Sequence, residues 1–206
     1  MSSYGDRWIA VKFREQDRDG RPVDIVLVSV YAPVSSALIE DWTTFFTDGD
    51  RCLDALPAAA LLLLAVDLNG ALGIDAPGTP DTPVGPFGLP HRTKSGDGWR
   101  NWLLAHQLCV SSMSYLRARR DHYGTWQHGQ TGKWYQNDCF VVRRRDLRRV
   151  RASRPRDAII PSDHRSVQLR LAIAVRLARP HQRPGDGLQR RDASSLLGKD
   201  NEPSAT

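Results

Sequence analysis

Disulfide-type cysteine patterns and membrane-length apolar runs are both missing from this 206-residue chain. Its three cysteines, Cys52, Cys109 and Cys139, are an odd number without CxxC spacing, which predicts reduced core thiols and excludes a disulfide framework or a spaced zinc site. The nine-residue apolar run Ala58–Val66 is too short to span a bilayer, which takes about 20 residues. The first ten residues do not form a signal peptide. We therefore expect an intracellular protein, nuclear or cytoplasmic, that is not secreted and has no membrane partner.

Acidic residues are fewer than basic ones: 23 against 29, giving a net charge of +6 and a pI near 9.6. This balance favours a polyanionic partner, either nucleic acid or phosphorylated small molecules. Much of the excess lies in eight arginines between residues 143 and 156. Such a cluster is most often a solvated surface, and it matches nuclear-import signals by chance. Beside a phosphodiester site it would also attract a nucleic-acid backbone without regard to sequence.

The stretch from Ala58 to Gly70 (AAALLLLAVDLNG) is the centre of the predicted fold. Its apolar run is typical of a strand buried on both faces or of a core helix. The turn-forming residues that follow favour the strand, with the chain turning at Asn69-Gly70. Asp67 and Asn69 lie two apart, so on a continued strand their side chains point to the same side and could hold water, phosphate or a metal ion. The alternative is an Asx turn that only ends the strand.

Strands and helices are predicted in alternating order through the first half of the chain. Trp8–Phe13 and Val23–Tyr31 should form an antiparallel hairpin, because an Asp-Gly pair and a proline between them mark a turn. Apolar residues at three- and four-residue steps then predict a helix, capped by Ser35 or Ser36 and interrupted near Gly49. Strand, helix and strand in this order make a parallel crossover unit.

The second half is predicted to be mostly strands after one helix. The expected elements are a Pro/Gly-rich loop at Ala71–Pro90, a helix at Asp97–Gln107, and strands at Leu108–Met113, Tyr123–Gln127 and Trp134–Val142. A last strand follows residue 164, with Val167, Leu169 and Leu171 alternating inward. We expect residues 1–175 to form one domain and residues 176–206 to be a disordered tail or linker.

Polar residues at strand ends are the candidate site residues. Asp138 lies in an apolar strand, where a carboxylate costs free energy unless it is paired, so we interpret it as a residue that orients a neighbour. Asp163 and His164 precede the last strand, and Tyr31 ends the hairpin. Each has a plain alternative: a solvent-facing aspartate, a turn, or a buried structural tyrosine.

Collected in chain order, these residues carry a family resemblance. The set is Tyr31-Ala-Pro, Asp67-x-Asn69, Thr125-Trp126, Asp138 and Ser162-Asp163-His164. It resembles the endonuclease/exonuclease/phosphatase superfamily, whose members cleave phosphate esters with Mg²⁺. The tract from Thr125, with the SDHRSVQLRL segment, is similar to endonuclease domains of LINE-type (non-LTR) retrotransposons and to host-encoded craniofacial development protein 2-like proteins. The resemblance runs from about residue 8 to residue 171.

The resemblance implies a fold and a role for each site residue. The fold would be an α/β four-layered sandwich, two β-sheets flanked by helices. Asp67 would orient or deprotonate the attacking water, and Asn69 would hold that water and the scissile phosphate. His164 would stabilise the phosphate's developing charge, and Asp138 would fix the histidine's tautomer. Tyr31 would touch the phosphate, and Asp163 would face a Mg²⁺ or Mn²⁺ ion.

The chain departs from the family pattern at the metal site. Family members begin with strands that carry an Asn and then the Glu that is the main Mg²⁺ ligand, and this sequence starts after both. Its three glutamates, Glu15, Glu40 and Glu202, do not lie in a Gln-Glu motif at the end of an apolar strand. We therefore expect a truncated form of the fold that lacks its first strands and helix. Binding of the metal ion should be weakened.

Three functions remain open at this point. The first is a Mg²⁺-dependent endonuclease that hydrolyses DNA phosphodiester bonds and derives from a retrotransposon. The second is a catalytically inactive remnant that binds nucleic acid through its arginines. The third is a phosphatase of phosphorylated lipids or sugars, which the LINE-like tract disfavours. The missing Glu favours weak or absent catalysis.

Overall fold

A six-stranded mixed sheet forms the centre of the computed structural model, which describes residues 1–17, 19–79, 81–112, 123–158 and 160–173. In order across the sheet the strands are β1 (Ser2–Tyr4), β2 (Trp8–Gln16), β3 (Pro22–Tyr31), β4 (Leu61–Asp67), β8 (Asp138–Arg143) and β5 (Leu108–Val110). Strands β3 and β4 are parallel, and the other neighbours are antiparallel. Strands β3 and β4 are apolar and are paired along both edges, so they lie in the interior of the sheet.

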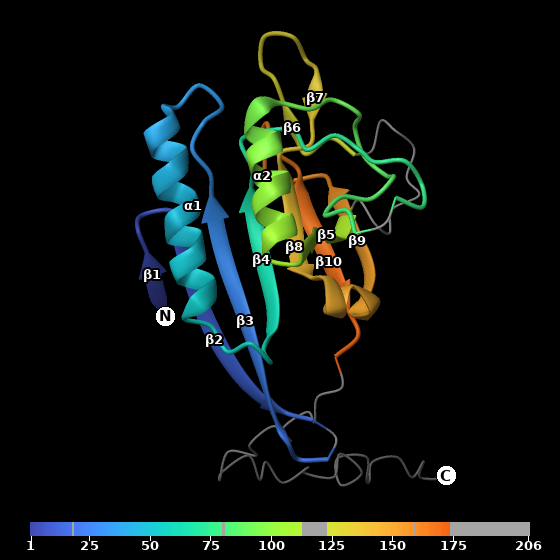
Figure 1. The fold of residues 1–206 in the computed structure, drawn as a ribbon. Helices are drawn as coiled ribbons and strands as arrows, with labels where there is room; N and C mark the ends of the chain where they lie inside the picture. The colour runs from blue at the N-terminus through green and yellow to red at the C-terminus, as the bar shows by residue number, and fades with distance from the viewer. Residues whose placement is uncertain (18, 80, 113–122, 159, 174–206) are drawn as a thin grey trace, which may run out of the picture. The chain divides into compact units, whose positions relative to one another are not determined.

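Two helices, α1 (Ile39–Asp54) and α2 (Lys94–Ala105), cover one face of this sheet (Figure 1). The main core lies between them and the sheet. Its largest fully buried side chains include Trp8, Phe45, Leu62, Leu64, Trp99 and Leu103. The Trp8 ring lies 5.0 Å from that of Phe45 and 5.4 Å from that of Trp102. An aromatic cluster therefore joins β2 to both helices.

A two-stranded sheet lies against the other face, over β4, β8 and β5. It consists of β9 (Val150–Arg156) and β10 (Ser166–Leu171), and the 3₁₀ helix Arg144–Arg149 leads into it. Cys109, Val142 and Val150 are buried between the two sheets, with Leu169 and Leu171 packed against them. A third, short hairpin of β6 (Trp126–Gln127) and β7 (Trp134–Tyr135) lies at the end of the molecule where β4 ends (Figure 1).

The predicted α/β class and several predicted elements are confirmed. The β2–β3 hairpin, the parallel strand–helix–strand unit and the inward alternation of Val167, Leu169 and Leu171 are all present. Within the described residues there is one helical layer, the six-stranded sheet, the β9–β10 sheet and the short β6–β7 hairpin. No helix in the described ranges has the length and apolar character needed to cross a bilayer. Met113 and the predicted tail at 176–206 lie outside the described residues.

Four local predictions are wrong. Helix α1 runs through Gly49, where a Cβ would lie 2.7 Å from the Trp8 ring, so the glycine permits close packing and does not break the helix. The α1 N-cap is Leu38, whose backbone N–H donates to Asp41, so neither predicted serine caps the helix. Helix α2 begins at Lys94 because Thr93 caps it. The strand predicted at 134–142 is two strands, β7 and β8, in different sheets.

Candidate active site

Three polar side chains form a row across the ends of neighbouring strands. Tyr31 at the end of β3 pairs with Asp67 at the end of β4, and Asp67 pairs with Asp138 at the start of β8. Strand β8 runs antiparallel to β4, so its first residue meets the last residue of β4. Directly opposed residues in a sheet project their side chains to the same face. The two carboxylates are therefore neighbours although 71 positions separate them in the sequence.

His164 completes the group from the loop that precedes β10. An isolated bridge to Trp126 holds its backbone. Its Nδ1 lies 3.0 Å from Oδ2 of Asp138, and ligand atoms of Asp67, Asp138 and His164 all lie within 4.8 Å of one another. With Nδ1 bonded to the carboxylate, Nε2 remains for a ligand. The structure thus brings together three residues that the sequence analysis selected separately.

Thr125 fixes the position of Asp138 from beneath the site. This threonine is 1% exposed. Its Oγ1 accepts hydrogen bonds from the backbone N–H groups of Asn137 (2.9 Å) and Asp138 (2.8 Å). Its own backbone N–H donates to the carbonyl of Tyr135 at 2.7 Å. A buried hydroxyl that accepts two backbone hydrogen bonds holds the start of β8 against the β6–β7 hairpin.

Both carboxyl groups are held in surroundings that disfavour their charge. Burial raises the pKa of Asp67 above its ordinary value, against the opposing effects of the Asn69 backbone N–H and His164. Burial also raises the pKa of Asp138, and the neighbouring charge of Asp67 raises it further, while Thr125 and His164 oppose the shift. Two partly buried carboxylates facing each other attract a proton or a cation. The electrostatics therefore favour a positively charged ligand between them.

Asn69 clamps the turn that follows β4. Its φ of 43° lies in the left-handed region, which asparagine tolerates better than most residues. Its backbone N–H donates to Oδ1 of Asp67 at 3.1 Å, and its Nδ2 donates to the carbonyl of Ala32 at 2.8 Å. The turn thus ties the end of β4 to the end of β3. The amide oxygen of Asn69 remains available as an acceptor.

These residues surround a pocket of about 580 Å³. Tyr31, Asp67, Asn69 and His164 line it. The other lining residues are Val34, Ser35, Gly70, Ala71, His91, Thr93, Trp126, Tyr135 and Asn137. Tyr31 is 54% exposed, so it is not the buried structural tyrosine of the alternative interpretation. The pocket combines acidic, imidazole, amide and aromatic groups on one rim.

Two curated proteins are similar to this chain in sequence. No model of a known protein family matches the chain. The Bos taurus protein named craniofacial development protein 2 is 26% identical over 85% of this chain and 29% of that protein. The Tragulus javanicus protein of the same name is 23% identical over 92% of this chain and 32% of its own length. The chain thus spans about three-tenths of the length of these curated relatives.

Solved structures are similar over most of the chain. The endonuclease domain of TRAS1, a telomere-specific non-LTR retrotransposon, gives a TM-score of 0.52 at 17% identity, covering 80% of this chain and 64% of that domain. The catalytic domain of Xenopus laevis APE2 gives 0.54 at 16% identity, covering 80% and 55%. The 3′-5′ exonuclease NExo of Neisseria meningitidis gives 0.53 at 15% identity, covering 80% and 79%. The chain has the endonuclease/exonuclease/phosphatase fold.

Within this endonuclease/exonuclease/phosphatase fold, the donor set of the site suits a divalent cation. Asp67 and Asp138 supply carboxylate oxygens, which Mg²⁺ and Mn²⁺ prefer, and Mg²⁺ usually takes only one or two carboxylates besides phosphate and water. Burial raises the pKa of both carboxyl groups, and the charge of Asp67 raises that of Asp138 further, so a cation between them would relieve an unfavourable arrangement. The predicted metal-facing residue, Asp163, accepts a 2.9 Å hydrogen bond from Trp126 Nε1. Its role as a ligand stays a prediction.

Three residues that support or line the site were not identified as such from the sequence. Thr125 appeared only as part of a motif, without a role. Arg7 was not considered, although its guanidinium lies 5.6 Å from the Tyr31 ring and donates to the carbonyls of Tyr31 and Ala32 at 3.4 Å. His91, which directly follows the Pro/Gly-rich loop, also lines the pocket. None of these carries a local sequence signal, because each reaches the site through long-range packing.

Proposed function

We propose that this chain is a divalent-cation-dependent phosphodiesterase of the endonuclease type, with DNA as its substrate. One observation carries the proposal: Asp67, Asp138 and His164 converge to within 4.8 Å at a pocket that Tyr31 and Asn69 also line. The similar structures support it, since one is the endonuclease domain of a non-LTR retrotransposon and another is a 3′ phosphatase bound to a product DNA hairpin. A retrotransposon origin is part of the same proposal.

Each residue has a role in water attack on a phosphodiester. Asp67 accepts a proton from the attacking water as the new oxygen–phosphorus bond forms and one ester oxygen leaves. Asn69 positions that water, which can donate to the amide oxygen, and a phosphate oxygen, which can accept from the second N–H of Nδ2. A Mg²⁺ or Mn²⁺ ion held by Asp67 and Asp138 would supply charge neutralisation when bound.

His164 stabilises the phosphate, and Asp138 positions His164. When the ring carries both protons, Nε2–H donates to a non-bridging phosphate oxygen on which negative charge grows. The 3.0 Å contact between Nδ1 and Asp138 fixes the orientation of the ring, so that Nε2 is the nitrogen that meets the substrate. Tyr31 adds an exposed hydroxyl at the same rim.

A basic surface supports DNA as the substrate class. Arg154 and Arg156 on β9 and Arg170 on β10 are exposed, and within the described residues none of them forms an ion pair. Arg156 Nε donates to Oε1 of the exposed Gln168 at 3.3 Å, across the β9–β10 pair. Surface guanidinium groups without a carboxylate partner favour a polyanion through counterion release.

Turnover should be slow. Among the described residues no glutamate lines the pocket. The carboxylates that could hold a metal ion together with His164 are those of Asp67 and Asp138. If the cation is weakly held, only a small fraction of the enzyme carries the ion and can cleave substrate. The same observation favours a second candidate, a remnant that binds DNA without cleaving it.

Plasmid nicking separates these two candidates. Purified protein is incubated with supercoiled DNA in Mg²⁺, in Mn²⁺ and in EDTA. The proposal expects slow nicking that EDTA stops and that Asp67→Ala lowers. Salt-dependent DNA binding without any nicking would establish the remnant. Nicking that persists in Asp67→Ala would place the chemistry elsewhere or in a contaminant.

The thermal stability of the protein should depend on the ionisation of Asp67, which faces Asp138. The native pKa of Asp67 lies above the unfolded one, so its ionised form costs stability at neutral pH and the cost fades as the pH falls and the carboxyl protonates. We expect Asp67→Asn to raise the Tm of the metal-free protein at pH 7.5 by about 2–4 °C, or about 1 kcal/mol. Millimolar Mg²⁺ should raise the Tm of the wild type more than that of the variant.

Scanning fluorimetry with and without EDTA at two pH values measures both effects. Asp24→Asn, remote from the pocket, is the matched control; it loses ion pairs to Lys12 and Arg14 and should not gain stability. A lower Tm for Asp67→Asn at pH 7.5 would contradict the prediction.

A further inference from the structure

A second cavity lies between the first turns of α1 and α2, next to the pocket. Its volume is about 570 Å³, and its lining residues include Ile39, Trp42 and Phe46 of α1 and Lys94, Asp97 and Gly98 of α2. We name it the α1–α2 groove. Nothing in the proposed reaction uses it.

Aromatic rings form the floor of the α1–α2 groove. The rings of Trp42 and Phe46 lie 5.8 Å apart at 33°. Gly98 leaves the Phe46 ring accessible from α2, since a Cβ at this position would stand 3.3 Å from Phe46 Cε2. Ile39 at the mouth is 66% exposed. Trp42 is 8% exposed and Phe46 is partly buried, so the floor is an apolar surface of two inclined rings against which the face of one nucleobase can pack.

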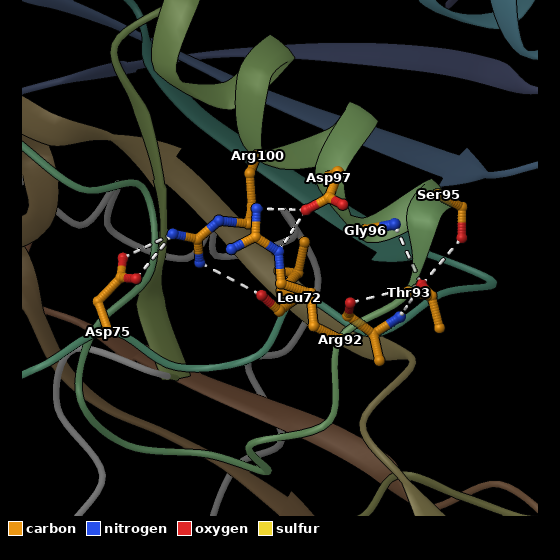
Figure 2. A network of polar contacts seen from close by, with 9 residues as sticks. Leu72, Asp75, Arg92, Thr93, Ser95, Gly96, Asp97 and Arg100 are labelled. Atoms are coloured by element: carbon orange, nitrogen blue, oxygen red, sulfur yellow. Dashed lines mark hydrogen bonds and ion pairs between the residues drawn. The ribbon is translucent and has the colours of Figure 1, made fainter.

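The rim of the groove carries positive charge. Asp97 is paired with Arg92, as Figure 2 shows, so its charge is compensated. Lys94 is exposed, and within the described residues it forms no ion pair. Thr93 caps the helix beside it, accepting from the Gly96 N–H at 3.1 Å (Figure 2). The groove therefore offers an unpaired ammonium group next to an apolar floor, which suits a phosphate joined to a base.

The groove is continuous with the pocket. Ser35 lines both cavities, and Thr93 of the pocket precedes Lys94 of the groove. A polynucleotide whose scissile phosphate lies at Asp67 and His164 must leave the pocket in two directions. Because Ser35 borders both cavities, the groove lies beside one of these exits.

We propose that the α1–α2 groove holds the nucleoside next to the scissile phosphate, with its base against Trp42 and Phe46 and its outer phosphate near Lys94. This inference rests on the proposed function and narrows its substrate class. A base can enter the groove only after it leaves the duplex stack. The preferred substrate is then DNA whose strand is unpaired beside the cleavage point, such as single-stranded or frayed DNA.

The test fills the groove from α2. Gly98→Leu places a side chain over Phe46, and Gly98→Ala fills it in part; both replace a helical glycine, so neither should lower helix stability. Asn101→Leu, on an exposed position of the same helix outside the groove, is the matched control. The probe is a short single-stranded oligonucleotide containing 2-aminopurine, compared with its blunt duplex, in EDTA and in Mn²⁺.

The wild type should bind the single strand about tenfold more tightly than the duplex and quench 2-aminopurine at one position. Gly98→Leu should lose about tenfold in single-strand affinity, Gly98→Ala less, and Asn101→Leu none, with duplex binding unchanged in all three. Lys94→Gln should release about one ion fewer when the single strand binds, seen as a shallower slope of log K against log salt concentration.

Other outcomes show whether the proposed function or only the groove assignment is wrong. If the wild type binds no DNA, the proposed function itself fails. If the wild type binds and cleaves DNA and Gly98→Leu behaves in the same way, only the groove assignment is overturned. If sedimentation shows a wild-type dimer that Gly98→Leu dissociates, a second copy occupies the groove and the nucleoside assignment is wrong.

Discussion

Asp138→Asn is expected to lower the rate of phosphodiester cleavage by at least about 100-fold while the fold is retained. The asparagine amide is close in shape to the carboxylate, but it cannot stabilise a charged imidazole. If its NH₂ group donates to Nδ1 of His164, Nδ1 becomes the acceptor and the ring is held as the neutral Nε2–H tautomer, without the positive charge that stabilises the phosphate. The 3.0 Å contact and the buried Thr125 support leave little freedom for another arrangement.

The rate is best followed with an activated aryl phosphodiester, whose good leaving group brings slow turnover into range. His164→Ala and the double variant Asp138→Asn/His164→Ala complete a cycle. At a saturating Mg²⁺ concentration, which removes differences in metal binding, the aspartate acts through the histidine, so the double variant should be little slower than His164→Ala alone. Losses that multiply, or an Asp138→Asn variant within twofold of the wild type, would refute the positioning role.

Trp8→Ala is expected to cost about 3–5 kcal/mol of unfolding free energy, a large part of the 5–15 kcal/mol typical of a domain. Trp8 is fully buried, its ring packs on Phe45, Trp99 and Trp102, and its Nε1 donates to the carbonyl of Phe45 at 3.0 Å. Removal leaves a large cavity and deletes the hydrogen bond to the Phe45 carbonyl. Both helices lose their contact with β2.

Urea titration followed by circular dichroism measures the loss. Trp8→Phe keeps most of the ring packing and should cost less, which keeps the comparison informative if the alanine variant does not fold. Phe13→Ala on the same strand is the exposed control, because this ring is 49% exposed. A Trp8→Ala variant within about 1 kcal/mol of the wild type would show that β2 is not part of the main core.

Much of the sheet could be predicted because its strands have strong local signals. The run Leu61–Asp67 is apolar and ends in turn-forming residues, so both its burial and its end were readable. The same argument placed Asp67 and Asn69 at the site. Gly49 was misread because a glycine within a helix signals a break locally, and only the packed Trp8 ring explains it.

The remaining site contacts depend on tertiary pairing. The stretch 134–142 has one continuous β-pattern, and its division between β7 and β8 comes from the two N–H groups that Thr125 binds. The meeting of Asp67 with Asp138 follows from the β4–β8 register, which no local pattern encodes. Arg7 reaches Tyr31 from a turn between strands, where spacing carries no information.

The row of Tyr31, Asp67 and Asp138 also determines which changes in chain length the molecule can accept. A single inserted or deleted residue within β3, β4 or β8 would rotate the following side chain to the opposite face and dismantle the row. The connection from Ala71 to Arg92 carries no such alternation, so lengthening or shortening it would reshape the mouth of the pocket without moving the carboxylates. Variation among natural homologues in indel position should therefore spare the strands and accumulate in that connection.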